Sequence, residues 1–529
     1  MRDLQIESPD RTERRDVLIV GAGAAGIVLA VELAQRGRSV TLLEGGGLNF
    51  EESSQDPYRS DLAGRPHRGI HAGRFRAVGG TTTMWGGQIL ELDEIDFAKR
   101  SWVPASGWPI SKQDLTRHYA RALELEGVSG AILDDGAVWQ RLGEPAPRLR
   151  KSASTDTAEL VSYLSRWCPE PNFARLHRRT LEASPLIHVW VHANAVELVL
   201  RDEVAQGVRC RTFTGREAVF AAARYVFCLG AIESSRFFLQ PRPAGDLLPW
   251  NRSGLLGRHF QDHIDSDAAL LQPINARALH RESDTIFVDG YKYNPKLKTT
   301  PEAQQTAEVL HAGGTIYASS DMDSVLAETK AAARNLLRGR VSELSGTQVA
   351  RLVRHAPLLA RQGYRYAVKH RAWHPSHAEM KLRVHCEQQP DSASTITLGD
   401  ERDALGLLRT RLAWRIAPME LRTIRHFVEE ARIALAGVAD VVAHPDLLAP
   451  DDRFVDRCED SFHHMGGMRM AASPTQGVVD LQLRLHGTCN TYVCSGAVFP
   501  TSGFSNPTHT LLALAVRLAE HLDTHEGDA

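Results

Sequence analysis

The sequence predicts a mixed α/β fold with two domains, and three observations support this prediction. The chain has 529 residues, of which 43% are hydrophobic, so it exceeds the length at which one core usually stops growing. Near the N-terminus a β-branched run (DVLIV), a glycine-rich turn (GAGAAG) and a helical pattern (IVLAVELAQRG) follow one another, as in a Rossmann-like unit. Residues 392–416 alternate apolar and polar side chains around a DALG turn, which is typical of paired strands.

The glycine-rich turn has the spacing of a dinucleotide-binding site. Gly21 would make the tight turn, Gly23 would let the backbone approach a pyrophosphate, and Gly26 would let the helix pack against the strand. The phosphates would lie at the helix N-terminus, where free N–H groups and the helix dipole favour an anion. We therefore expect contacts with the ligand from Gly21, Gly23, Ala24, Ala25 and Gly26.

A carboxylate follows at the distance that such a site requires. The second apolar run, SVTLLE, ends in Glu44, where a carboxylate can accept hydrogen bonds from both ribose hydroxyls. A carboxylate at this position disfavours a 2′-phosphate. The expected ligand is therefore FAD or NAD, and this motif does not separate the two.

Composition and charge exclude several other classes of protein. The formal net charge of −2 provides no overall field that would attract nucleic acid. The seven cysteines are scattered without a CxxC pair, so we expect neither a disulfide framework nor a metal site. The N-terminal residues are charged throughout and no apolar run reaches membrane-spanning length, which predicts a cytoplasmic protein without an integral membrane segment.

Later segments carry further elements of the first domain. Residues Ala77 to Gly87 read AVGGTTTMWGG, a loop that can bring backbone N–H groups and small side chains against a flat ring. Residues 187–200 are predicted to form strands, and residues 223–240 a strand, a small turn and a helix. We expect these later segments to return to the first sheet.

A pair of histidines precedes two glycines in the segment SFHHMGGMRM, residues 461–470. Adjacent residues point to opposite faces of a strand and about 100° apart on a helix, so two neighbouring imidazoles cannot easily serve one site. At most one of them is expected to be catalytic.

Six motifs together resemble the glucose–methanol–choline (GMC) family of FAD-dependent oxidoreductases. They occur in the family's order and span nearly the whole chain: GAGAAG with Glu44, VGGTTTMWGG, CLGAIESSRFFL, GLLGRHFQDHI, HHMGGMRM, and GAVFPTSGFSNPTHTLLALAVRLAEHL. The resemblance implies an FAD-binding domain assembled from residues 12–100, 185–265 and 450–529. It also implies a substrate-binding domain on a mostly antiparallel sheet with helices, from residues 101–184 and 266–449.

The resemblance also implies which residues contact the flavin and which are catalytic. The HxxGxxRM pattern places a catalytic histidine at His463, and the second catalytic residue falls on Asn506, 43 residues later. His464 is then expected to be structural, and His509 is a departure from the family's usual aliphatic residue. Besides the residues of the glycine turn and Glu44, the expected cofactor contacts are Gly79, Gly80, Thr81, Met84, Trp85, Gly86, Gly87, Val196, Gly230, Ser495, Gly496, Asn506, Pro507 and Thr508.

The implied activity is the oxidation of an alcohol, with sugars and glycosides (the pyranose oxidase-like branch) as the expected substrates. Electrons would pass to O2 or to an external acceptor. Met84 stands where some relatives carry the histidine that binds FAD covalently, so we expect non-covalent FAD. A non-sugar natural-product alcohol remains an alternative, as does a hydroxynitrile lyase with non-redox FAD.

One segment is not explained by the motifs. Residues 324–371 contain ten Lys or Arg against two Glu, with apolar residues at helical spacing. They are expected to form solvated surface helices, and the alternative is a docking surface for a partner subunit or for anionic lipid.

Overall fold

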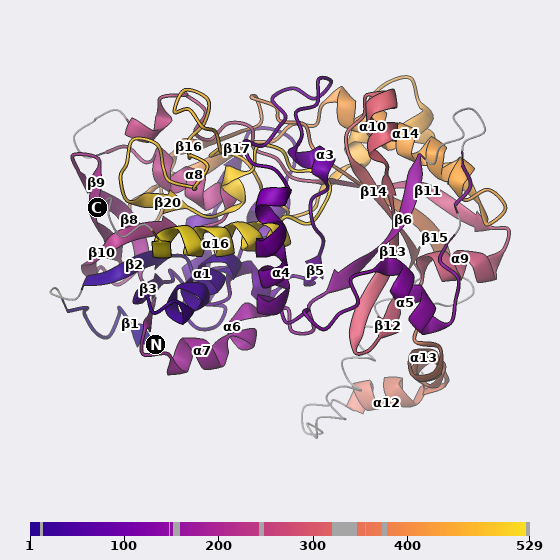
Figure 1. Ribbon diagram of the computed structural model, residues 1–529, viewed down its shortest axis with the longest axis horizontal. Coiled ribbons are helices and arrows are strands. Elements are labelled where there is room, and N and C mark those ends of the chain that lie inside the picture. The colour runs from indigo at the N-terminus through magenta and orange to yellow at the C-terminus, as the bar shows by residue number, and fades with distance from the viewer. Residues whose placement is uncertain are drawn as a thin grey trace.

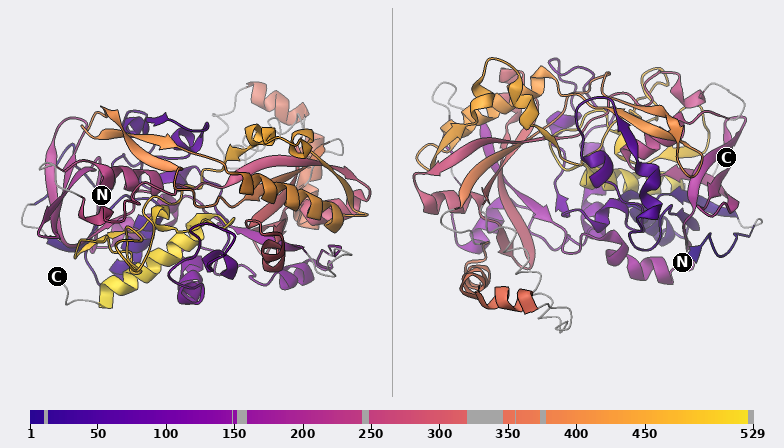
Figure 2. Two further views of the ribbon diagram at one scale, coloured as in Figure 1. Left: turned by 90° about the horizontal axis from the view of Figure 1, so that it is seen from above. Right: turned by 180° about the vertical axis from the view of Figure 1, so that it is seen from behind.

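The computed structural model describes residues 1–10, 14–147, 149–151, 159–242, 248–319, 346–354, 356–372 and 378–524. The chain forms two lobes side by side, each built around its own β-sheet (Figure 1). Both chain termini lie in the same lobe, and several segments cross between the lobes (Figure 2). This arrangement confirms the predicted mixed α/β fold.

The first lobe is built on an eight-stranded sheet. Its strand order is β1-β7-β3-β2-β10-β9-β8, with β20 beside β10, and all pairs from β1 to β10, and β10 with β20, are parallel. The bounds are β1 Arg2–Asp3, β2 Arg14–Val20, β3 Val40–Leu43, β7 Ile187–Val191, β8 Asn194–Arg201, β9 Val204–Arg211, β10 Glu217–Phe227 and β20 Thr491–Val493.

Helices from opposite ends of the chain cover this sheet. Helix α1 (Ala24–Gln35) follows β2 and the glycine turn, as predicted, and packs against the C-terminal helix α16 (Pro507–Thr524). Buried apolar side chains of β2, β3, α1 and α16 belong to one core. The predicted return of residues 187–200 and 223–240 is confirmed by β7, β8, β10 and helix α8 (Ala231–Leu239).

The second lobe is built on a nine-stranded sheet in which every described pairing is antiparallel. Helix α14 (Pro418–Ala434) packs on this sheet, and its apolar residues join the second core. In spatial order the strands are β18 Ala439–Ala443, β11 Ile264–Pro273, β15 Glu379–Cys386, β14 Ala312–Ser319, β13 Tyr291–Thr299, β6 Leu160–Trp167 and β5 Gln88–Ile89, with β12 Ile286–Val288 and β19 Glu459–Asp460 at the side.

The hairpin predicted for residues 392–416 is present, but it does not belong to the second sheet as we expected. Strands β16 (Thr395–Arg402) and β17 (Leu408–Ala413) form a separate three-stranded sheet with β4 (Ser60–Leu62). Strand β4 pairs with β17, and α8 packs against β16. These contacts hold the hairpin on the first lobe, so alternation predicted the strands correctly but not their sheet.

The remaining described helices connect and cover these sheets. They are α2 Gly69–Ala72, α3 Glu94–Phe97, α4 Thr116–Leu125, α5 Asp135–Leu142, α6 Phe173–Leu176, α7 Arg178–Ala183, α9 Ala276–Ser283, α10 Pro301–Ala307, α12 Gly346–Arg354, α13 Ala356–Lys369 and α15 Pro445–Leu448, with short 3₁₀ turns at 53–58, 80–83, 113–115, 249–251, 453–457 and 496–498.

The basic segment is described only in part. Residues 320–345 and 355 lie outside the described residues, whereas α12 and α13 form helices that project from the second lobe (Figure 1). Val353, Tyr364 and Tyr366 are exposed on them. The docking role considered for this segment stays a prediction. Among the described helices, none combines the length and the hydropathy needed to cross a membrane.

Candidate active site

A cavity of about 600 Å³ lies beside the glycine turn of the first lobe. Its wall includes segments from both ends of the chain, from Val20 to Leu511. Most of the residues predicted from the sequence to contact a cofactor or substrate lie in this wall: Gly21, Gly23, Ala24, Ala25, Glu44, Gly80, Thr81, Met84, Trp85, Gly86, Gly87, Gly230, His463, Ser495, Gly496, Asn506, Pro507 and Thr508.

The glycine turn has room for a ligand at one of its three glycines only. A Cβ added to Gly21 would lie 2.6 Å from the Cys228 carbonyl oxygen, and one added to Gly26 would lie 1.9 Å from the Gly21 carbonyl oxygen. A Cβ on Gly23 would meet no atom within 4 Å. Gly23 therefore faces the open cavity at the start of α1, where the helix N-terminus favours an anion, whereas Gly26 serves packing and does not line the cavity.

Glu44 is buried at the edge of the cavity and is fixed by backbone groups. The Ala22 N–H donates to Glu44 Oε2 (3.0 Å), and the Gly46 N–H donates to Glu44 Oε1 (2.9 Å). Burial raises the pKa of the Glu44 carboxyl, although these two N–H groups and Arg76 oppose that effect. The side chain is held in one place beside the turn, as a ribose-binding carboxylate must be.

Two arginines that sequence reasoning missed also line the cavity. Arg74 and Arg76 are both about nine-tenths buried, and the Arg74 Nη1 and Arg76 Nε atoms have no hydrogen-bond partner. Burial lowers the pKa of Arg74 to about 10, so it stays cationic at neutral pH. Buried guanidinium donors without partners fit a ligand that carries phosphate groups. Their position directly before the loop 77–87 was the available sequence signal.

The loop 77–87 packs against the glycine turn. The Gly79 N–H donates to the Ala22 carbonyl oxygen (2.8 Å), and a Cβ on Gly80 would lie 2.9 Å from the Gly23 Cα. Trp85 is anchored by its Nε1–H on the Pro171 carbonyl oxygen (2.6 Å). Gly79 thus holds the loop in place without lining the cavity. Val196 does not line it either, whereas its neighbour Ala195 does.

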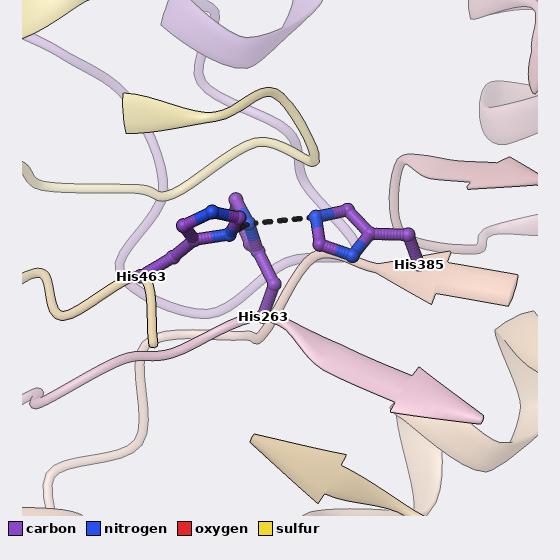
Figure 3. Close-up of side chains that lie close together, drawn as sticks. All are labelled: His263, His385 and His463. Carbon is purple, nitrogen blue, oxygen red and sulfur yellow. Dashed lines mark hydrogen bonds between the residues drawn. The ribbon is translucent and has the colours of Figure 1, made fainter. Parts of the chain in front are cut away.

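The two adjacent histidines point to different surroundings. Asn506 Nδ2 lies 2.8 Å from His463 Nε2, and His263 Nδ1 lies 3.0 Å from His463 Nδ1 (Figure 3). His464 instead packs against the rings of His67 and Phe260, and its Nε2 lies 3.7 Å from Asp262 Oδ2. Of the two histidines, His463 contacts Asn506 and His464 does not. This agrees with the expectation that neighbouring side chains point in different directions.

The glycines after the histidine pair are required for close packing. Gly466 has a φ of +73°, and a Cβ there would lie 2.0 Å from the His259 carbonyl oxygen. Gly467 has a φ of +100°, and a Cβ there would lie 2.3 Å from Ser235 Oγ. Beside them, Asp262 Oδ1 accepts the His463 backbone N–H (2.8 Å). The local sequence therefore fixes the backbone that carries His463.

The electrostatics of this site keep His463 neutral. Burial, followed by the neighbouring His385, lowers the pKa of His463 from 6.5 to about 3. A neutral imidazole has one nitrogen lone pair that can accept a proton. His463 is therefore neutral over the whole neutral range of pH, with one nitrogen lone pair that can accept a proton.

Sequence reasoning missed the polar groups beyond His463 and Asn506. Gln88 and Trp167 line the cavity, whereas His263, His385 and Lys296 stand behind the pair on the second sheet. These residues come from β5, β6, β13 and β15 and from the residue directly before β11, and no local motif connects them. His509 does not line the cavity. Its Nδ1 lies 2.7 Å from Glu126 Oε2, and both side chains are buried between α16 and the end of α4.

Comparisons with known proteins identify similar families and relatives. The GMC oxidoreductase family matches residues 390–515, and a family described as an NAD(P)-binding Rossmann-like domain matches residues 19–74. The chain is 23% identical to the 2-methyl-1,2-propanediol dehydrogenase of Mycolicibacterium austroafricanum, over 98% of this chain and 96% of the relative. It is 22% identical to the 6'''-hydroxyparomomycin C oxidase of Streptomyces lividus, over 96% of this chain and 91% of the relative.

Solved structures agree in fold. The pyridoxine 4-oxidase of Mesorbium loti superimposes with a TM-score of 0.59 at 16% identity, covering 97% of this chain and all of that one. A formate oxidase superimposes with a TM-score of 0.56 at 14% identity, over 98% and 99% of the two chains. The two family matches and the full-length relatives show that this chain is similar to GMC oxidoreductases, a family that uses FAD and acts on CH–OH donors, and the solved structures show the same fold.

Proposed function

We propose that the enzyme oxidises a secondary hydroxyl of a sugar or glycoside to the carbonyl. The observation that carries this proposal is the contact between His463 Nε2 and Asn506 Nδ2 in the wall of the cavity that the glycine turn also lines. A proton acceptor and a hydrogen-bond donor lie together there, as the oxidation of an alcohol requires.

The two side chains would divide the work on the hydroxyl group. His463 Nε2 would accept the hydroxyl proton, and Asn506 Nδ2 would donate a hydrogen bond to the substrate oxygen. Such positioning, in well-oriented systems, contributes several kcal/mol. FAD, when bound, supplies the acceptor for the hydride that leaves the same carbon. Exclusion of water by the cavity wall would strengthen both polar contacts.

The cofactor contacts predicted from the sequence remain part of this proposal. The glycine turn, Arg74 and Arg76 would hold the pyrophosphate, and Glu44 would hold the adenosine ribose. The loop 79–87 and the segments 495–496 and 506–508 would surround the ring. The division into an FAD-binding domain (12–100, 185–265, 450–529) and a substrate-binding domain (101–184, 266–449) is proposed with these qualifications: β5 and β19 lie in the second sheet, the hairpin of β16 and β17 lies on the first lobe, and α4 packs on α16.

The relatives and the cavity support a polar, polyhydroxylated substrate. Two of the relatives are oxidases of aminoglycosides by name, and a third is a fructose dehydrogenase large subunit from Gluconobacter japonicus. The cavity wall near His463 contains hydrogen-bonding side chains, among them Gln88 and Asn506. Such a site discriminates strongly against analogues that lack a hydroxyl.

We propose that FAD is not covalently bound, because Met84 has no group able to form a histidyl linkage. The thioether is exposed in the cavity wall. Acid precipitation of the yellow protein should therefore leave FAD in the supernatant, as measured by its absorbance. Yellow colour retained in the washed pellet would contradict this prediction.

Anaerobic mixing tests the proposed activity. FAD-loaded protein is mixed with paromamine, D-fructose, methyl glucosides, pyridoxine and 2-methyl-1,2-propanediol, and loss of flavin absorbance is recorded before air is admitted. We expect bleaching by a sugar or an aminoglycoside. Rapid recovery in air would indicate O2 as the acceptor, and slow recovery an external carrier. Bleaching by none of these polyols and sugars would count against the proposal and favour a non-redox role for FAD.

A further inference from the structure

A row of hydrogen bonds runs from the second sheet to His463. Lys296 on β13 donates from Nζ to Gln88 Oε1 on β5 (2.9 Å). Gln88 Nε2 donates to Asn506 Oδ1 (2.5 Å), and Asn506 Nδ2 lies 2.8 Å from His463 Nε2. Four segments distant in sequence thus form one continuous chain of polar contacts.

The direction of every bond in this chain follows from its first member. A lysine ammonium can only donate, and a carboxamide has one accepting and one donating end. Lys296 therefore requires the oxygen of Gln88 on its side, which turns the Gln88 amide nitrogen toward Asn506. The Asn506 oxygen then faces Gln88, and its nitrogen faces His463. Amide orientations are ambiguous in isolation, but here they are fixed by the lysine.

This row of hydrogen bonds also fixes which nitrogen of His463 carries the proton. Because Asn506 donates to Nε2, that nitrogen carries the lone pair, and the neutral ring carries its proton on Nδ1. Nδ1 lies 3.0 Å from His263 Nδ1, which can accept this proton in a hydrogen bond (Figure 3). Both nitrogens of His463 are then satisfied by one tautomer.

We infer that Lys296 is a positioning residue that sets the tautomer of His463, with the Nε2 lone pair in the cavity and Asn506 Nδ2 as the donor beside it. The inference rests on the proposed function of His463 as the base. A substrate hydroxyl would take the place of the direct Asn506–His463 contact, donating to Nε2 and accepting from Nδ2. His463 Nε2 is thus already an acceptor, and Asn506 Nδ2 already a donor, before substrate binds.

His385 competes with His463 for the same nitrogen of His263, which has a single lone pair. His385 Nε2 lies 3.0 Å from His263 Nδ1, and His385 Nδ1 lies 2.5 Å from Asp265 Oδ1. The three histidine nitrogens lie within 4.8 Å of one another, as donors around a metal ion would. A proton on His463 Nδ1 is incompatible with a metal ion at that atom. The polarity set by Lys296 therefore favours a hydrogen-bonded cluster.

Lys296 titrates within the range of pH that can be measured. Burial, opposed by Asp265 and assisted by Lys292, lowers its pKa from 10.5 to about 8. Gln88 is its neutral partner, and the groups facing His463 are His263, His385, Asp265 and Lys296 itself. A neutral amine can accept as well as donate. The preference of the hydrogen bonds for one direction should therefore weaken as the pH rises through that pKa.

The direct test reads the tautomer and needs no substrate. Resting FAD-loaded protein is labelled with ¹⁵N-histidine, and the His463 signals are assigned by their loss in His463→Asn. We expect an unprotonated Nε2 and a protonated Nδ1 at pH 7. Lys296→Met should produce a mixture of tautomers or the inverse one, whereas the matched control Lys298→Met, two residues along β13 and paired with Asp93, should not change the signals. A Lys296→Met spectrum identical to that of the parent protein would overturn the inference.

A second variant covers failure of Lys296→Met to fold. Gln88→Glu keeps the shape of the side chain but removes the N–H that faces Asn506, so the Asn506 amide should turn and place its oxygen toward His463. Flavin reduction by the best substrate of the panel should fall by about 10- to 100-fold, less than the roughly 10²- to 10⁴-fold of a complete general-base effect, with substrate affinity changed less. Unchanged reduction in Gln88→Glu would contradict the inference.

The pH profile separates positioning from a merely structural role. In the parent protein, flavin reduction should decline above about pH 8, and Lys296→Arg should retain the rate and lose this decline, because arginine does not titrate there. If flavin reduction in Lys296→Arg declines at the same pH as in the parent protein, titration of Lys296 does not cause the decline. If His463→Ala reduces flavin normally, the proposed function fails; if only the Lys296 and Gln88 variants behave normally, the positioning role alone fails.

Discussion

At the scale of single residues, the environment of His463 determines the pH dependence of the reaction. Its pKa is lowered to about 3, first by burial and then by His385. The neutral form is the proton acceptor and is present above the pKa, so lowering the pKa extends the active range toward acid.

We therefore predict that the rate of flavin reduction does not fall between pH 7 and pH 5. Anaerobic stopped-flow measurements over this range, with FAD content checked at each pH, test the prediction. A half-maximal rate near pH 6.5, the usual value of a histidine, would show that His463 is not held neutral as described.

The proximity of His463 and Asn506 could be predicted from the sequence, whereas the residues around them could not. His463 and Asn506 lie in two short motifs with a characteristic spacing. Lys296 and Gln88 come from strands of the second sheet, and His263 directly precedes β11. Their proximity depends on the crossing of segments between the lobes. A lysine in an alternating strand looks like an ordinary solvated side chain until the fold brings it to Gln88.

At the scale of elements, the strand, glycine turn and helix at the N-terminus can be tested glycine by glycine. Gly23→Ala places a methyl group in open space, so the protein should fold with an unchanged unfolding temperature and yet bind FAD poorly. Gly26→Ala places it 1.9 Å from the Gly21 carbonyl oxygen, so the helix must shift and the apoprotein should lose about 1–3 kcal/mol of stability, as in overpacked cores.

Thermal unfolding of the apoproteins and titration with FAD distinguish these two effects. Normal FAD affinity in Gly23→Ala would mean that the pyrophosphate does not approach this turn. The sequence predicted the close packing at Gly21 and Gly26 because the spacing of the glycines is set by local backbone geometry. The pyrophosphate contact of Gly23 stays a prediction.

Another element-scale prediction concerns the hairpin of β16 and β17. Arg236 on α8 is 1% exposed and binds Glu233 (2.8 Å) and Asp403 (2.5 Å). Removing the guanidinium leaves both carboxylates buried without their partner, so Arg236→Met should destabilise the protein by about 3–5 kcal/mol. Denaturant unfolding measures this loss.

Lys381→Met, which removes a partly exposed ion pair, serves as the control and should change stability by less than about 1 kcal/mol. An Arg236→Met variant as stable as this control would contradict the role of the ion pairs. The sequence could not place this hairpin, because alternation specifies a strand but does not specify its neighbours.

At the scale of the whole molecule, the cavity is built from both ends of the chain. The glycine turn lies near residue 21, and His463 and Asn506, the proposed catalytic pair, lie beyond residue 460. The parallel pairing of β10 with both β2 and β20, and the packing of α1 on α16, bring these ends together. The order of the six motifs predicted that the two ends of the chain come together at the cavity, although no single motif predicts it.

His463 is proposed to be the base for alcohol oxidation in the FAD-loaded enzyme. Anaerobic flavin reduction in the parent protein and in His463→Ala, at equal FAD content and with the fastest-reacting alcohol of the panel, tests this role. We predict that His463→Ala retains the flavin and loses about 10²- to 10⁴-fold in the reduction rate, the usual contribution of a positioned base. Reduction at the parental rate in His463→Ala would contradict the claim.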